Sequence, residues 1–236
     1  MRRRKIYILG GSGFLGREIC RLVVAMGHEP VSVSRGGRPA IEEPWVEGVE
    51  WVQSNILGAD GELGDWGSAL AGCDALIHAV GIGEEDPASG QSFARLHRES
   101  VALAARKAAE MGVGKFVFIS ADQLPPGLPQ GYLQTKLDAE SDLQGVAIPT
   151  AILRPSFIHD GTLGLFGALA AMPTQSTEDL LETGEVSALQ NWLLQTPGVR
   201  LEKVAMAALR AALQPETLGV LDPAEIDYLG DAMFIQ

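Results

Sequence analysis

Tyr132 and Lys136 form a YxxxK pair in the segment YLQTK, residues 132–136. This spacing places both side chains on one face of a helix. An ammonium beside a phenol favours the phenolate, so it lowers the tyrosine pKa from about 10 and lets the tyrosine exchange a proton near neutral pH. The simpler alternative is a surface Tyr–Lys pair on an amphipathic helix.

Ser120 ends the predicted strand KFVFIS, residues 115–120, upstream of this pair. The carboxyl ends of parallel strands border the crevice in which such sheets bind ligands. A serine there can hydrogen-bond a substrate oxygen while Tyr132 exchanges its proton. Ser120, Tyr132 and Lys136 are therefore the candidate catalytic residues.

The stretch GGSGFLG, residues 10–16, follows a strand pattern and opens a helical one. Gly10, Gly13 and Gly16 form GxxGxxG, and Gly11, Gly13 and Gly16 also satisfy GxGxxG. Glycines at this spacing permit a sharp turn, close approach to a pyrophosphate and tight packing of helix on sheet. Because the amino end of a helix attracts phosphate, the stretch predicts a dinucleotide site. The alternative is a purely structural turn.

The end of the second predicted strand bears on which dinucleotide is bound. An acidic residue there would hold the ribose 2′-hydroxyl of NAD, but the sequence reads Ser34-Arg35-Gly36-Gly37-Arg38. Arg35 can bind a 2′-phosphate bidentately, which favours NADP(H) over NAD(H). The alternative is that Arg35 and Arg38 are ordinary loop charges.

Strand and helix patterns alternate through the first two thirds of the chain. We expect strands at 5–9, 31–34, 49–54, 73–81, 115–120 and 150–155, and helices at 14–26, about 91–111 and 132–143. Further helices are expected at 163–172, 177–195 and 202–213, followed by a short strand in TLGVL and a helix capped by Asp222 with Pro223 and Glu225.

Strands separated by crossover helices pair in parallel, and near-continuous apolar strands belong to a sheet covered on both faces. The expected fold is an α/β, doubly wound Rossmann-type parallel sheet with a small, mostly helical C-terminal lobe. Residues 1–155 would be the dinucleotide-binding domain. Residues 156–236 would be a substrate-side lobe packed on it, not an independent domain.

Composition narrows the function classes. The 236 residues carry a net charge of −12, which argues against a nucleic-acid binder, whose footprint would be basic. Arg2-Arg3-Arg4-Lys5 is the one basic cluster, and we interpret it as a solvated, frayed end rather than a membrane or acidic-partner contact. The cysteines and histidines show no metal-ligand spacing. No transmembrane stretch or signal peptide is evident, which suggests a cytoplasmic protein.

These segments resemble the extended and atypical short-chain dehydrogenase/reductase superfamily, which includes NAD-dependent epimerase/dehydratase and NmrA-like proteins. The matching pieces come in family order and cover about two thirds of the chain: GGSGFLG, VSVSRGGRP, SNIL, IHAVG, FVFISA, YLQTK and ILRPSFIHDG. The short tail after Arg154-Pro155 suggests small atypical members, such as the NADPH-binding accessory subunit of respiratory complex I.

The resemblance implies a set of cofactor-binding residues. Those at the pyrophosphate would be Gly10, Ser12, Gly13, Phe14, Leu15 and Gly16, with Arg35 at the 2′-phosphate. Asn55 and Ile56 would lie by the adenine, Ala79, Val80 and Gly81 under the ribose, and Lys136 on the ribose. Arg154, Pro155, Ser156 and Phe157 would border the nicotinamide and the substrate.

One departure from the family concerns proton transfer. His97 falls where many members keep an asparagine that organises a water-linked proton path. His97 could relay protons or the path could be absent, but we interpret it as a half-exposed helix histidine.

The sequence thus predicts an NADP-dependent oxidoreductase that transfers a hydride to or from a small carbonyl or alcohol substrate. The alternative is a non-catalytic NADPH-binding structural, assembly or redox-sensing protein. Phe157, Phe166, Met172 and Trp192 in the expected substrate wall make an apolar substrate conceivable, although core packing explains them equally well. A monomer and a homodimer both remain open.

Overall fold

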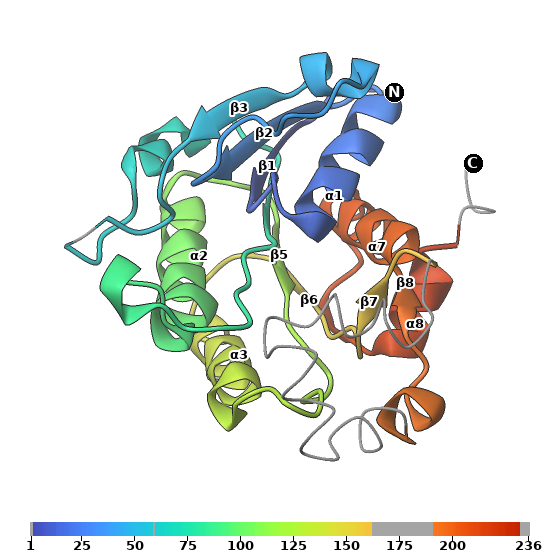
Figure 1. Ribbon diagram of the computed structural model, residues 1–236. Coiled ribbons are helices and arrows are strands. Elements are labelled where there is room, and N and C mark those ends of the chain that lie inside the picture. The colour runs from blue at the N-terminus through green and yellow to red at the C-terminus, as the bar shows by residue number, and fades with distance from the viewer. Residues whose placement is uncertain (1, 59, 162–190, 232–236) are drawn as a thin grey trace.

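The computed structural model describes residues 2–58, 60–161 and 191–231. Seven parallel strands form the central sheet in the order β3-β2-β1-β4-β5-β6-β9 (Figure 1). The strands are β1 Lys5–Leu9, β2 Glu29–Ser34, β3 Glu50–Gln53, β4 Ala75–His78, β5 Phe116–Ile119, β6 Thr150–Leu153 and β9 Gly219–Leu221. Two short strands, β7 Ile158–His159 and β8 Val199–Arg200, pair in parallel beside this sheet.

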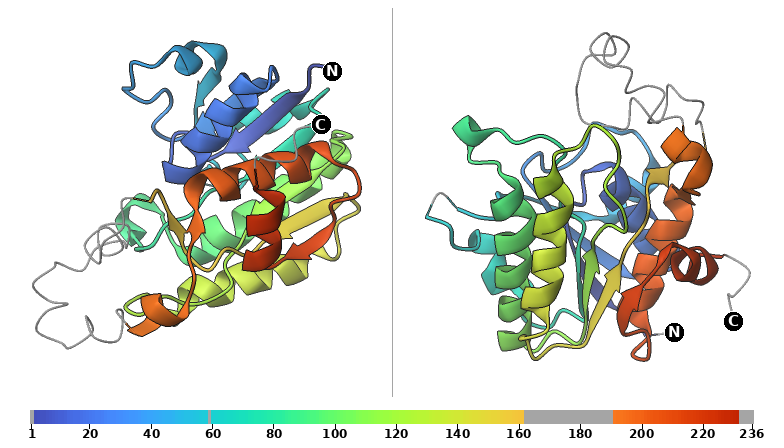
Figure 2. Two further views of the ribbon diagram at one scale, coloured as in Figure 1. Left: turned by 90° about the vertical axis from the view of Figure 1, so that its right-hand side faces the viewer. Right: turned by 90° about the horizontal axis from the view of Figure 1, so that it is seen from below.

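Helices cover both faces of the sheet, as Figure 2 shows. One face carries α1 (Phe14–Ala25) and α7 (Leu201–Leu213), with α8 (Pro223–Leu229) packed on α7. The other carries α2 (Ser100–Glu110) and α3 (Gln130–Leu143). Short turns complete the described secondary structure: 3₁₀ helices η1 Pro44–Gly48, η2 Asp65–Leu70 and η3 Pro87–Ser89, and the π-helix η4 Ala94–Glu99.

The two helical layers follow from the apolar strands. Side chains alternate along a strand, so an apolar run supplies both faces of the sheet. In β1, Ile6 and Ile8 enter the cluster under α1 and α7, whereas Tyr7 and Leu9 enter the cluster under α2 and α3. The doubly wound Rossmann-type sheet expected from the sequence is thereby confirmed.

Element boundaries differ from the expected ones by a few residues in most strands and by one π-helix before α2. Most strands are shorter by one to several residues, and β2 begins two residues earlier, at Glu29. The helix expected at about 91–111 instead contains the π-helix η4 before α2. Such wide turns commonly occur at functional sites. The apolar pattern of the sequence does not reveal a π-helix, because its wider turn shifts the apolar face of the helix only locally.

The C-terminal part returns to the central sheet. Strand β9 pairs with β6, and α7 packs along α1. The predicted cap of α8 is confirmed, because Asp222 and Glu225 form a capping box with Pro223 in the first turn. The helix expected at 163–172 lies outside the described residues, as does most of the one at 177–195, of which residues 191–195 are helical. The division at residue 155 stays a prediction.

The basic N-terminal cluster is paired rather than frayed, contrary to the expectation. Arg2 and Arg4 contact Asp74, Arg3 contacts Glu29, and the Lys5 ammonium lies 3.8 Å from Glu50. These carboxylates stand at the start of neighbouring strands, so the basic cluster offsets their negative charge at the amino ends of the strands. No helix in the described part of the chain is long and apolar enough to cross a membrane.

Gly16→Ala provides a test of the packing of α1 on the sheet. A Cβ at Gly16 would overlap the carbonyl oxygen of Gly10. Alanine gains about 1 kcal/mol of helix propensity. Overpacking against backbone costs about 1–3 kcal/mol or more, so we expect a net loss of stability. Thermal unfolding measures it, with Gly81→Ala as the control because a Cβ there meets nothing within 4 Å. Equal melting temperatures for the two variants would contradict this packing.

His78 is a buried polar residue in the middle of the core. Its ring is fully buried on β4, packs against Phe116 and Phe118, and lies 2.9 Å from Ser100 Oγ through Nε2. Nδ1 has no partner among the described atoms. Burial lowers the pKa of His78 to about 3, so the ring is neutral at physiological pH.

The neutral His78 predicts acid sensitivity. Its pKa is lower in the folded chain than in the unfolded chain, where it is 6.5, so the unfolded chain binds more protons as the pH falls below 6.5 and stability drops. Between pH 6.5 and 5, where most carboxylates stay ionised, linkage gives a loss of about 1.5 kcal/mol from this one residue. Denaturant unfolding at both pH values should show a smaller loss in His78→Gln. An unchanged loss in the variant would refute the assignment.

Candidate active site

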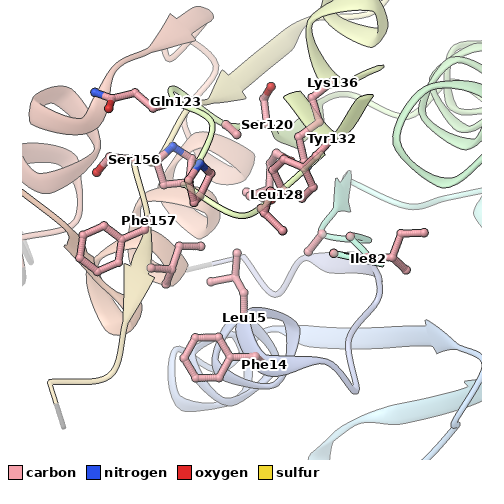
Figure 3. Close-up of a pocket in the computed structure, with 18 of the residues that line it drawn as sticks. Phe14, Leu15, Ile82, Ser120, Gln123, Leu128, Tyr132, Lys136, Ser156 and Phe157 are labelled. Carbon is pink, nitrogen blue, oxygen red and sulfur yellow. The ribbon is translucent and has the colours of Figure 1, made fainter. Parts of the chain in front are cut away.

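A cavity of about 350 Å³ lies at the carboxyl ends of β1, β4 and β5 (Figure 3). This is the point where the strand order reverses, because β2 and β3 extend the sheet to one side of β1 and β4 begins the other side. Loops that leave adjacent strands in opposite directions open a crevice there. The cavity is therefore where ligand binding is expected in such a sheet.

The glycine loop after β1 forms one side of the cavity. Gly10 has φ +85°, and a Cβ there would lie 2.9 Å from the carbonyl oxygen of Ala79. Gly13 precedes α1 as its N-cap, and no side chain caps that helix end. The N–H groups of the first helical turn are thus available to an anion. Close loop approach and uncapped N–H groups fit the pyrophosphate of a dinucleotide.

The loop after β4 forms the floor and is held by His97. The ring of His97 is 0% exposed, and its Nε2 accepts a hydrogen bond of 3.0 Å from the backbone N–H of Ile82. Nδ1 faces Thr135 Oγ1 at 3.5 Å. Burial and the nearby Lys136 lower the pKa of His97 to about 2. The interpretation as a half-exposed helix histidine is wrong: both ring nitrogens face partners, and the neutral ring supports residues 81–83.

Tyr132 and Lys136 occupy one wall of the cavity from successive turns of α3. Lys136 is 3% exposed, and its Nζ donates to the carbonyl oxygen of Ile119 at 3.0 Å. Nζ also lies 5.7 Å from the centroid of the Tyr132 ring, which contacts His97 and Phe93 edge-on. The lysine therefore lies near the tyrosine, as predicted, but its Nζ lies over the face of the ring.

The two pKa values follow from burial. Burial lowers the pKa of Lys136 to about 8, against the opposing attraction of Glu140. Burial also raises the pKa of Tyr132, which is opposite to the lowering expected from the sequence. The physical reason is that desolvation disfavours a phenolate. Tyr132 is thus a neutral phenol in this structure.

Ser120 belongs to a buried network that the sequence did not suggest. Its hydroxyl donates to Glu140 Oε1, and the Arg154 guanidinium donates to both oxygens of the same carboxylate. Ser120 and Glu140 are 3% and 5% exposed. The hydroxyl hydrogen expected to meet a substrate oxygen is therefore engaged by Glu140 in this structure, and Arg154 is directed to Glu140.

The cavity brings most of the predicted site residues together, and others lie around it. Those that line it are Gly13, Phe14, Leu15, Ala79, Val80, Gly81, Ser120, Tyr132, Lys136, Pro155, Ser156, Phe157 and Trp192. Gly10 and Gly16 shape the glycine loop from behind, and Arg154 pairs with Glu140. Ser12, Arg35, Asn55 and Ile56 lie outside the lining, in the loops after β1, β2 and β3.

At the end of β2 the two arginines differ. Arg38 forms an ion pair with Glu47. The Arg35 side chain is exposed, and its backbone carbonyl accepts from Gln53 Nε2. A Cβ at Gly36 would lie 3.6 Å from Ser12 Oγ, so this loop adjoins the glycine loop. The end of β2 therefore borders the region of the expected dinucleotide.

Several residues around the cavity escaped sequence reasoning. Ile82, Gln123 and Leu128 line it from loops, where no periodicity marks them. Glu140 follows Lys136 by one more helical turn, so the spacing that identified Tyr132 and Lys136 could have found it. Among the described residues, no three His, Cys, Asp or Glu side chains are grouped to hold a metal ion.

Comparison with known proteins gives consistent relationships. The family model described as NAD(P)H-binding matches residues 10–186. An uncharacterised chloroplastic protein of Arabidopsis thaliana is 30% identical over 96% of this chain and 77% of its own length. MIOREX complex component 2 of Saccharomyces cerevisiae is 24% identical over 94% of this chain and 98% of its own.

A 2-alkyl-3-oxoalkanoate reductase of Stenotrophomonas maltophilia is 29% identical over 65% of this chain, and the match spans about half of that protein (51%). Among solved structures, a short-chain dehydrogenase/reductase superfamily protein of Agrobacterium tumefaciens with bound NAD superposes with a TM-score of 0.65. It is 18% identical, and the match covers 93% of this chain and 77% of that protein. The chain therefore belongs to the NAD(P)H-binding family and has the fold of the short-chain dehydrogenase/reductase superfamily.

Proposed function

We propose that the protein is an NADP(H)-dependent oxidoreductase that acts on a small carbonyl or alcohol substrate. The observation that carries this proposal is the position of Tyr132 and Lys136, on a cavity wall beside the loops that fit a dinucleotide. The name of the oxoalkanoate reductase relative supports carbonyl chemistry, and the family supports the nicotinamide cofactor.

The dinucleotide, when bound, supplies or accepts the hydride, and the chain's residues handle the proton. Tyr132 donates its phenolic proton to the substrate oxygen during reduction and recovers it from solvent. Because burial keeps Tyr132 protonated, the structure favours its role as an acid. Below its pKa of about 8, Lys136 carries a charge that stabilises the phenolate left behind.

Ser120 contributes less directly in this proposal. To donate to a substrate oxygen its hydroxyl must turn away from Glu140, which keeps its bonds to Arg154. This rotation of the hydroxyl replaces a charge-assisted hydrogen bond to Glu140 with a hydrogen bond of ordinary strength to the substrate oxygen. Ser120 therefore orients the substrate, whereas Tyr132 is the group that supplies the proton.

The preference for NADP(H) rests on Arg35. Its exposed guanidinium is near the end of β2, whereas Arg38 is engaged by Glu47. A planar guanidinium binds a phosphate bidentately.

Titration of the apo protein with NADPH and NADH tests this preference. We expect NADPH to bind more tightly, and Arg35→Asp to weaken NADPH binding by about tenfold or more, since a lost ion pair costs about 1.4 kcal/mol or more. NADH binding should be kept or strengthened, because a carboxylate at this place can accept a hydrogen bond from the ribose 2′-hydroxyl. Arg38→Asp is the matched control and should have a smaller effect. Equal affinities for both cofactors, insensitive to Arg35→Asp, would overturn the assignment.

Tyr132→Phe separates catalysis from binding. Loss of a positioned general acid lowers kcat by about 10²–10⁴-fold, while the affinity for NADPH should stay within about twofold because the hydroxyl is not proposed to hold the cofactor. Ser120→Ala should cost only about tenfold, since an ordinary hydrogen bond contributes about 1 kcal/mol. Steady-state rates and NADPH titrations measure both quantities. A Tyr132→Phe protein with the wild-type rate would eliminate this mechanism.

A second function is favoured by the engaged state of the same residues. Ser120 donates to Glu140 and Lys136 donates to Ile119, so a chain that only holds the dinucleotide would need no change in these contacts. The name of the yeast relative, a complex component, agrees with such a role. This alternative predicts slowly released NADPH and a melting temperature that falls when the dinucleotide is stripped. Rapid exchange with steady turnover would exclude it.

Cytoplasmic location and a monomeric or homodimeric state stay predictions.

A further inference from the structure

We infer that the cavity accepts an uncharged carbonyl compound with an apolar body, and discriminates against substrates that carry a phosphate or carboxylate. This inference rests on the proposed function, because it assigns the reacting carbonyl to the wall of Tyr132. It goes beyond that function by naming the chemical class of the rest of the substrate, and it sets this chain apart from the oxoalkanoate reductase, whose named substrate carries a carboxylate.

The first observation is the lining of the cavity away from Tyr132. Leu15 on α1 and Leu128 in the loop before α3 approach it from opposite sides, with Ile82 and Phe157 at its flanks (Figure 3). Trp192 also lines it and stacks near Phe157, with ring centroids 5.4 Å apart. Side chains from five separate segments thus present apolar surface to the same space. Burial of an apolar ligand against such surface is favourable, because it removes apolar area of both ligand and protein from water.

Phe14 strengthens the first observation. It is 45% exposed at the start of α1, although large apolar side chains are usually buried. It stands at the edge of the cavity beside Leu15. The dinucleotide and an apolar ligand that extends from the cavity would together cover this exposed ring.

The second observation concerns the polar groups at the rim. Ser156 donates to the carbonyl oxygen of Pro197, and Gln123 Oε1 accepts from Thr196 at 3.3 Å. These bonds join the loops around the cavity to residues 196–197. The Ser156 hydroxyl and the Gln123 side-chain oxygen are thus used to hold the wall.

The third observation is charge. Among the described residues 155–161 and 191–199, Asp160 is the one acidic residue and there is neither lysine nor arginine. Among the described lining residues, Lys136 is the one lysine or arginine, and it donates to Ile119. The two arginines that flank this stretch are paired, Arg154 with Glu140 and Arg200 with Glu202. An anionic group beside Leu128 and Phe157, away from Lys136, would be desolvated without a counter-charge, which is costly.

The experiment compares two ligands of equal length, 2-nonanone and 8-oxononanoate, which differ in a terminal carboxylate. Binding is followed by fluorescence in saturating NADP⁺, which cannot reduce either ligand, so it does not depend on turnover. Trp192→Phe reports the share of the signal that arises in the cavity, because Trp192 is the one tryptophan among the described lining residues. Reduction by NADPH is measured separately.

We expect 2-nonanone to bind at least about tenfold more tightly than the keto acid, which corresponds to about 1.4 kcal/mol. Leu128→Arg adds a cation to the apolar wall and should reverse the order, with Ile82→Arg as a second variant if the first fails to fold. Stronger binding of the keto acid to the wild-type protein, or binding of neither ligand, would overturn the inference. Selective binding of 2-nonanone without reduction by NADPH would support the inference about the cavity and refute the oxidoreductase proposal instead.

Discussion

The structure depends on the close approach of two backbones at the point where the strand order reverses. Strands β1 and β4 are neighbours, and the loops that leave them must pass side by side before they diverge to opposite faces of the sheet. Gly10 meets Ala79 there with no room for a Cβ. Because this contact fixes where α1 begins and where the cavity floor lies, the positions of the site residues follow from it.

Helix α3 transmits the geometry of the sheet to the chemistry. Tyr132, Lys136 and Glu140 stand on successive turns of α3. Tyr132 contacts the His97 ring, and Lys136 donates to the carbonyl of Ile119. Glu140 binds both Ser120 and Arg154. Two of these anchors are at the ends of β5 and β6. Displacement of α3 would break the hydrogen bond from Lys136 to Ile119 and those of Glu140 with Ser120 and Arg154, which hold the wall in one arrangement.

Local patterns in the sequence predicted the sheet, its helices and the glycine loop, because period and turn chemistry are encoded by neighbouring residues. They did not predict that His97 is buried, since its partner Ile82 lies in a loop fifteen residues away. Nor did they reveal that Ser120 donates to Glu140, a contact across twenty residues. The raised pKa of Tyr132 likewise depends on how tightly α3 packs on the sheet, which no spacing reveals. Most of the predicted residues line one cavity, but their hydrogen bonds had to be seen in three dimensions.

The pairing of β7 with β8 has an evolutionary consequence. Ile158 lies opposite Val199, so these two points of the chain are held side by side, the first just after β6 and the second just before α7. The entropic cost of closing a loop grows only slowly with its length. Residues between these two strands can therefore be lengthened, shortened or exchanged during divergence while the dinucleotide half keeps its geometry.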